Sequence, residues 1–123
     1  MVAEWWRQQG LDALIVPGLA LPALPHGMSQ LLMINCCYTF LTNLLNYPTG
    51  SVPITKVREG EDEYELSEGL FKDIFTAPAK KTMKGSLGLP VGIQVCTLPW
   101  EDEKCLRVMK EVETAVGFHE YAL

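Results

Sequence analysis

Few side chains in this sequence have the type and spacing that covalent or acid–base chemistry requires. None of the four serines lies in the Gly-x-Ser-x-Gly elbow, in which a strained turn exposes a nucleophilic hydroxyl. They are Ser29, Ser51, Ser67 and Ser86. We expect Ser29 to begin a helix and Ser51 to begin a strand. Spacing alone therefore predicts no serine with an activating neighbour.

The cysteines favour a structural role. They have no CxxC spacing and stand among apolar neighbours, which is typical of buried free thiols and not of a disulfide scaffold. The four are Cys36, Cys37, Cys96 and Cys105. A nucleophilic dyad of Cys36 or Cys37 with His26 is the alternative. It would need an exposed, electropositive thiol, whereas these two lie in an apolar segment.

Metal and phosphate motifs give no stronger signal. His26 and His119 lie far apart in the sequence, and no HExxH or CxxC pattern occurs. Gly85 and Gly88 resemble a phosphate loop only superficially, because Lys84 precedes them, whereas a P-loop lysine follows its glycines. We therefore expect no metal ion and no other cofactor, and we assign these glycines to a turn.

Composition and charge limit the class of protein. The chain has 123 residues, of which 48 % are hydrophobic, and a formal net charge of −5. These values are typical of one globular domain with a buried core, and they argue against nucleic acid as the main partner. Acidic residues crowd between positions 59 and 68, and Lys80, Lys81 and Lys84 form a small basic cluster. We expect both groups to be solvated surface.

Hydrophobic periodicity, prolines and glycines predict an alternating order of elements. Strands are expected at 13–16, 51–57 and 91–98, and helices at 2–9, 28–47, 64–75 and 101–116. The continuous apolar run at 13–16 is typical of a strand covered on both faces, as in a parallel sheet. Gly10 and Gly117 are expected to end the first and last helices, and Pro78 to interrupt the third. This order predicts an α/β fold with helices layered on a sheet.

The stretch between Asp12 and Lys56 contains no Asp, Glu, Lys or Arg and must be buried somewhere. Its segment 28–47 is long enough to cross a bilayer, but several Asn and Thr residues and the lack of a basic flank favour a buried core helix. A membrane-spanning or re-entrant segment remains the alternative. Three strands are few to shield so apolar a helix, so we expect a part of a larger domain. Glu4 and Arg7 are charged residues near the N-terminus that prevent the apolar run of a signal peptide, so we expect no signal peptide.

Several separated motifs, in the correct order, resemble the amidase signature family. They are DALIVP at 12–17, NLLNYPTGSVP at 43–53 and GLPVGIQ at 88–94. Further stretches resemble more closely the fatty-acid amide hydrolases of that family. These are CYT at 37–39, GLFKDIF at 69–75, LPWE at 98–101 and CLRVM at 105–109. The resemblance covers almost the whole chain.

The resemblance implies a hydrolase that cleaves long-chain fatty-acid amides with a Ser-cis-Ser-Lys triad, in a mixed sheet flanked by helices. The triad lies upstream in the family, and this chain has no Gly-Gly-Ser-Ser-Gly-Gly stretch. We therefore expect residues 1–123 to be the C-terminal part of a single amidase domain, inactive alone, that contributes core sheet and one wall of the acyl channel. A noncatalytic interaction module that keeps part of the fold is the alternative, and a small lipid carrier is a third.

The resemblance also implies substrate-binding residues. It places Met33, Cys36 and Phe40 on the channel side of the long helix, with Phe75 facing the same space. Offsets of three and four residues independently put the first three on one helical stripe, although periodicity alone leaves ordinary core packing as an alternative. The family commonly has Trp at the position of Phe75 and a small aliphatic residue at that of Phe40. These departures leave the preferred acyl length open.

Partners and location follow only from the resemblance. It implies a fatty-acid amide substrate in the complete enzyme, no cofactor, and an intracellular, endomembrane-associated protein whose membrane attachment is made by a helical cap upstream of the matched region. A homodimer is one arrangement that the sequence leaves open.

Overall fold

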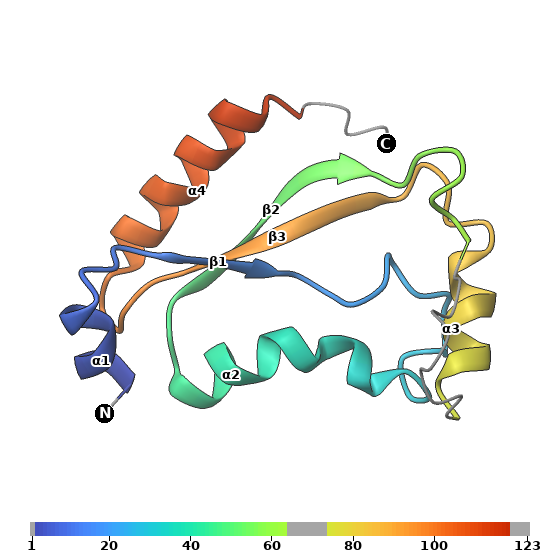
Figure 1. Ribbon diagram of the computed structural model, residues 1–123, viewed down its shortest axis with the longest axis horizontal. Coiled ribbons are helices and arrows are strands. Elements are labelled where there is room, and N and C mark those ends of the chain that lie inside the picture. Colours follow the sequence, from blue (N-terminus) through green and yellow to red (C-terminus); the bar gives the residue numbers. More distant parts are fainter. Residues whose placement is uncertain (1, 64–73, 119–123) are drawn as a thin grey trace.

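The computed structural model describes residues 2–63 and 74–118. In chain order its elements are α1 (Val2–Gln8), β1 (Leu14–Pro17), the 3₁₀ helix η1 (Met33–Cys36), α2 (Cys37–Leu45), β2 (Thr49–Lys56), α3 (Thr76–Met83), β3 (Pro90–Cys96) and α4 (Asp102–Val116). Figure 1 shows α4 on one side of the strands and α2 on the other. The predicted α/β class is confirmed, and all three predicted strands are present within two or three residues of their expected bounds.

The sheet has the order β1-β3-β2, and both pairings of the central strand β3 are antiparallel. Ile15 and Gly50 stand opposite Val95 from its two sides. The parallel pairing expected for residues 13–16 is therefore wrong for the described strands. Burial explains the error: residues along β1 alternate between half-buried and exposed, and Ile15 is 57 % exposed, so only one face of this apolar strand is packed.

The helix ends follow the glycine signals at both ends of the chain. Gly10 and Gly117 have positive φ angles of 65° and 62°, and each follows a helix. A glycine reaches this left-handed region without steric cost, which explains its use as a C-terminal cap.

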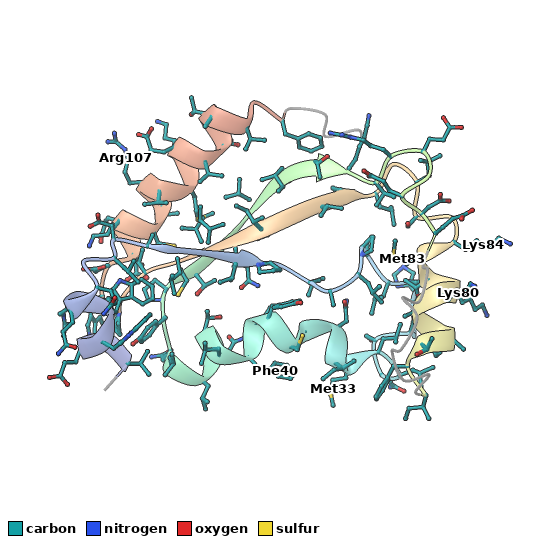
Figure 2. All side chains as sticks on the ribbon, in the orientation of Figure 1. Met33, Phe40, Lys80, Met83, Lys84 and Arg107 are labelled. Atoms are coloured by element: carbon teal, nitrogen blue, oxygen red, sulfur yellow. The ribbon has the colours of Figure 1, made fainter. Side chains whose placement is uncertain are left out.

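The third predicted helix is placed differently. Residues 64–73 lie outside the described part of the chain, and the helix that is described, α3, begins at Thr76. The expectation that Pro78 interrupts a helix is wrong, because it lies in the first turn of α3, where a backbone N–H has no partner within the helix. Figure 2 shows Lys80 and Lys84 pointing outward from α3, and the expected solvation of this basic cluster is confirmed.

The segment 28–47 does not form one buried helix. Regular α-helix is limited to the nine residues of α2, preceded by the short η1. Side chains compete for the helix carbonyls: the Thr39 hydroxyl donates to Cys36 O at 2.9 Å, and the Asn43 amide donates to Thr39 O at 2.8 Å. The expected burial is also wrong within the described residues, since Leu44 is 82 % exposed.

One face of the sheet is closed by α4. Val52, Val95 and Cys105 form a buried cluster between β2, β3 and this helix. The Met109 side chain lies directly over Gly50, in the space that a Cβ atom at this position would occupy. The apolar stripe predicted for the last helix is thus confirmed at its first three turns, whereas Val116, at its end, is 44 % exposed.

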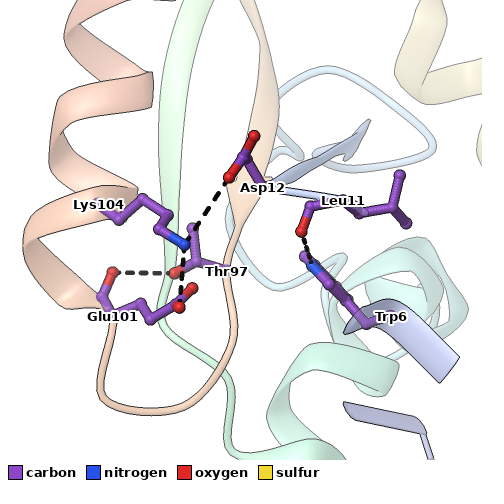
Figure 3. A network of polar contacts seen from close by, with 6 residues as sticks. All are labelled: Trp6, Leu11, Asp12, Thr97, Glu101 and Lys104. Atoms are coloured by element: carbon purple, nitrogen blue, oxygen red, sulfur yellow. Dashed lines mark hydrogen bonds and ion pairs between the residues drawn. The ribbon is translucent and has the colours of Figure 1, made fainter. Parts of the chain in front are cut away.

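The opposite face of the sheet is packed beside α1. Trp6, Cys96 and Leu98 form a second buried cluster. The Trp6 ring stands edge-on to Tyr47, with ring centroids 5.9 Å apart and an interplanar angle of 74°. Its indole Nε1–H donates to Leu11 O at 2.6 Å, so the one polar group of this side chain is satisfied (Figure 3). Aromatic contacts of this geometry stabilise α1 on the sheet.

Polar contacts join the end of β3 to the start of α4. The fully buried Thr97 hydroxyl donates to Glu101 O at 3.1 Å, and Lys104 Nζ lies 2.9 Å from Glu101 Oε1 and 4.0 Å from Asp12 Oδ1 (Figure 3). The Lys104 and Asp12 side chains are largely solvated, so their ion pair contributes little to stability. The buried hydroxyl is the contact that fixes this corner.

Shortening a buried side chain of the central strand should destabilise the fold. Val95 is 0 % exposed, so Val95→Ala leaves a cavity and should lower the free energy of unfolding by about 2 kcal/mol. Thermal denaturation measures the loss. Val116→Ala, at a 44 % exposed position of α4, is the matched control and should leave the midpoint nearly unchanged. Equal midpoints for the two variants would contradict the assignment of β3 as the centre of the core.

Candidate functional site

The predicted apolar stripe lies on one helical segment. Met33 is the first residue of η1 and Cys36 the last, and Phe40 lies in α2. Met33 is 69 % exposed and Phe40 is 50 % exposed, while Cys36 is half-buried. Figure 2 shows the Met33 and Phe40 side chains on the side of this segment that faces away from the sheet. Met33 and Phe40 therefore belong to an open apolar surface, which we call the wall face, and the half-buried Cys36 lies between them in the sequence.

Phe75 is not part of this segment. It occupies the N-cap position of α3 and is half-buried. Figure 1 shows α3 beyond the ends of the strands, at one end of the fold. The structure thus joins three of the four predicted binding residues on a continuous helical segment and places the fourth on a separate helix.

The wall face carries no charge. Between Asp12 and Lys56 the sequence has no Asp, Glu, Lys or Arg, and His26 is exposed in the loop before η1. The segment 33–45 has large apolar side chains that are at least half exposed, of which Met33 and Phe40 lie on the wall face. The others are Ile34, Leu41 and Leu44. Such a surface is suited to an apolar ligand or to another apolar surface, since exposed patches of this kind mark binding sites in soluble proteins.

A cavity that the sequence did not reveal lies on another side of α2. It has a volume of about 130 Å³ between α1, β1 and α2 and is lined mainly by aromatic and aliphatic side chains. These include Trp5, Trp6, Leu14, Tyr38, Leu41 and Leu45. The spacing of Tyr38, Leu41 and Leu45 by three and four residues is the signal that could have revealed it.

Two further cavities border the strands. One, of about 370 Å³, lies between the loop at 18–23 and the strand residues Ser51, Pro53 and Val91. The other, of about 300 Å³, lies beside Tyr47 and Trp100. None of the four predicted binding residues lines these two cavities or the one between α1 and α2. Their assignment to substrate binding stays a prediction.

The thiols differ from one another in burial. All four cysteines are free, as predicted, but only Cys96 and Cys105 are buried, and Cys37 is exposed. The expectation that all four are buried is therefore wrong, because α2 leaves one side uncovered. Burial raises the pKa of the Cys96 thiol above its ordinary value, a hydrogen bond with Thr49 opposes the shift, and nearby Cys105 adds to it.

The described residues offer few groups for bond cleavage. The Ser86 hydroxyl is buried and has no hydrogen-bond partner in this part of the chain, while Ser29 and Ser51 are exposed. Over residues 2–63 and 74–118, no group of three or more His, Cys, Asp or Glu side chains could hold a metal ion. Within the same ranges, no helix has both the length and the apolar character needed to span a bilayer.

An antiparallel sheet with one helix-covered face and one apolar, partly open face is thus the framework of this site. Its sequence matches the family model for amidases over residues 1–106, and the chain belongs to the amidase family.

Named relatives agree with this membership. The chain is 43 % identical over 113 residues to fatty-acid amide hydrolase 1 of Sus scrofa, an alignment that covers 91 % of this chain and 19 % of that protein. It is 34 % identical over 109 residues to fatty acid amide hydrolase 1 of Caenorhabditis elegans, covering 89 % and 19 %. An amidase of Gibberella moniliformis is 30 % identical over 106 residues, covering 84 % and 17 %. The chain spans about a fifth of the length of these relatives.

The buried thiol of Cys96 predicts a loss of stability in alkali. Because the folded state raises the pKa of Cys96, the unfolded chain releases this proton first once the pH passes 9.0, the ordinary value. The free energy of unfolding therefore falls as pH rises above that point and is unaffected by this group below it. Between about pH 8 and about pH 10.5, the thermal midpoint of Cys96→Ala should fall less than that of the unaltered protein. The midpoint of Cys37→Ala, a change at an exposed thiol, should fall in parallel with that of the unaltered protein. If the midpoints of all three proteins fell in parallel with pH, the raised pKa of Cys96 would be contradicted.

Proposed function

We propose that this chain is part of a fatty-acid amide hydrolase and contributes core sheet and one wall of the channel that holds the acyl chain. The observation that carries the proposal is the wall face: Met33 and Phe40 stand exposed on one side of an uncharged helical segment. The 43 % identity to fatty-acid amide hydrolase 1 of Sus scrofa supports the same substrate class.

The physical fit is between an uncharged surface and an uncharged ligand. A long acyl chain has no group that needs a hydrogen bond, and each buried CH₂ group contributes about 0.8 kcal/mol. Side chains such as Met33 and Phe40 supply apolar area without imposing a polar contact. Methionine also adapts its shape, which suits a flexible chain. The wall face thereby favours binding of the tail and leaves cleavage of the amide bond to other residues.

Bond cleavage is assigned to residues outside this chain. In this proposal a serine nucleophile attacks the amide carbonyl, a neutral lysine takes its proton through a bridging serine, and backbone N–H groups stabilise the oxyanion. The C–N bond then breaks as that proton passes to the departing amine, and water releases the fatty acid from the serine. The buried, unpartnered Ser86 has no place in this scheme. The chain described here acts by positioning the acyl chain relative to that machinery.

A noncatalytic interaction module is the second candidate. It is favoured by the same exposed apolar residues, Leu41 and Leu44 above all, which are 60 % and 82 % exposed and would be buried against a protein partner. The two candidates differ in whether a longer protein that contains this chain turns over an amide.

Hydrolysis of oleamide separates the two candidates. The longer protein should release oleic acid and ammonia, whereas the 123-residue chain alone should release neither, because its sequence has no Gly-Gly-Ser-Ser-Gly-Gly stretch. Product is measured by mass spectrometry with heat-denatured protein as the control. Turnover by the isolated chain, or none by the longer protein, would contradict the proposal.

Shortening Phe40 should change the preference for acyl length. In the longer protein, Phe40→Ala removes a ring from the wall face, so the ratio of kcat/KM between long-chain and short-chain amides should change by about fivefold, with less effect on kcat. Leu106→Ala, at a 63 % exposed position of α4, is the control and should keep the ratio. An equal loss of turnover for every chain length would contradict the placement of Phe40 in the channel wall.

A further inference from the structure

Asn35 is an unusual residue within the wall-face segment. It lies in η1 between Met33 and Cys36, and it is 3 % exposed although Ile34 beside it is 51 % exposed. Burial of an amide side chain is costly unless its polar atoms find partners. Its partners therefore indicate why a polar residue stands at this position.

Both acceptors of Asn35 bind the same loop. The side-chain Oδ1 accepts a hydrogen bond from the backbone N–H of Leu21 at 2.6 Å. The backbone oxygen accepts another from the N–H of Ala20 at 3.1 Å. Two adjacent amides of the loop after β1 are thus held by one residue of η1.

The other end of this loop is held by the central strand. Gln94 of β3 is 7 % exposed, and its side-chain Nε2 donates to Pro17 O at 3.1 Å and to Gly18 O at 3.0 Å. The short loop segment 17–21 is therefore fixed to β3 at one end and to η1 at the other. Through it, a partly buried polar connection runs from the sheet to the start of the wall-face segment.

Side chains also hold this segment: Leu32, directly before η1, is 2 % exposed, and Leu41 and Leu45 of α2 line the cavity beside β1. The backbone of α4 packs closely against β2 and β3, whereas the extensive backbone contacts of α2 among the described elements are with η1. At its C-terminal end the segment is held by Tyr47, which packs against Trp6. At its N-terminal end the segment is held by the hydrogen bonds that Asn35 accepts.

We propose that Asn35 is a positioning residue that sets the place of Met33 and Cys36, and so the acyl length that the wall face accepts. The proposal rests on the proposed function and adds a residue to it. Asn35 does not touch the acyl chain in this arrangement. It acts through the segment 17–21, which is hydrogen-bonded to β3 at one end and to η1 at the other. This segment therefore fixes η1 relative to β3.

Two substitutions separate hydrogen bonding from volume. In the longer protein, Asn35→Leu keeps a similar size but removes the acceptor of the Leu21 N–H, so the start of the segment should shift. Asn35→Asp keeps an acceptor oxygen at the same place. Gln30→Leu, at an exposed amide just before η1, is the matched control. Each variant is assayed with amides of long, medium and short acyl chains.

Asn35→Leu should change the ratio of kcat/KM between long-chain and short-chain amides by about fivefold, the effect of losing one hydrogen bond of ordinary strength. The change should come mainly from KM. Asn35→Asp and Gln30→Leu should stay within about twofold of the unaltered ratio. Hydrogen exchange at the Leu21 amide should accelerate in Asn35→Leu and stay slow in Asn35→Asp.

The outcomes distinguish this inference from the proposed function. If the unaltered longer protein hydrolyses no fatty amide, the proposed function fails. If it does, and Asn35→Leu lowers kcat equally for all chain lengths or leaves every ratio unchanged, Asn35 is an ordinary structural residue and the inference is overturned. The inference is supported if Asn35→Leu shifts the ratio of kcat/KM between long-chain and short-chain amides and Asn35→Asp keeps the unaltered ratio.

Discussion

The antiparallel pairing of β3 with strands on both sides is the constraint on which the rest of the structure depends. Because successive side chains of a strand point to opposite faces, Val95 enters the cluster under α4 and Cys96 enters the cluster with Trp6. One strand thus centres both cores. The same alternation places Gln94 on the face of Cys96, where its amide reaches the loop that leads to the wall-face segment. Displacement of β3 would disturb both buried clusters and the bonds of Gln94 to this loop.

The two faces of the sheet are covered to different degrees. On one face, the Met109 side chain of α4 lies directly over Gly50 of β2, and Cys105, Val108 and Val112 of the helix are buried or half-buried. On the other, α2 presents Leu44 and Met33 to the exterior, at 82 % and 69 % exposure. Exposed apolar area of this extent is unfavourable in water. In the proposed function, this open face is the one that contacts the acyl chain.

Buried polar side chains fix geometry where apolar packing is thin. Thr97 joins the end of β3 to α4, Gln94 joins β3 to the loop after β1, and Asn35 joins that loop to η1. Each bond contributes only about 1 kcal/mol net, but a donor left unpaired after burial costs more. A shifted position of one of these segments would leave a buried donor unpaired, which costs more free energy than the bond contributes in the observed position. For η1 and α2, these bonds add to the burial of Leu32 and to the side chains that line the cavity beside β1.

The sequence by itself determined the family, the α/β class, the three strands, and the last helix with its Gly117 cap. These features are encoded by local signals: motifs in order, apolar runs bounded by proline, and a glycine free to adopt a positive φ angle. Strand direction, the short extent of α2, the helical place of Pro78 and the buried role of Asn35 were decided by the tertiary structure. Each depends on partners distant in the sequence, such as Pro17 for Gln94 and Leu21 for Asn35, and an apolar pattern does not specify which partner a residue meets or which face is left open.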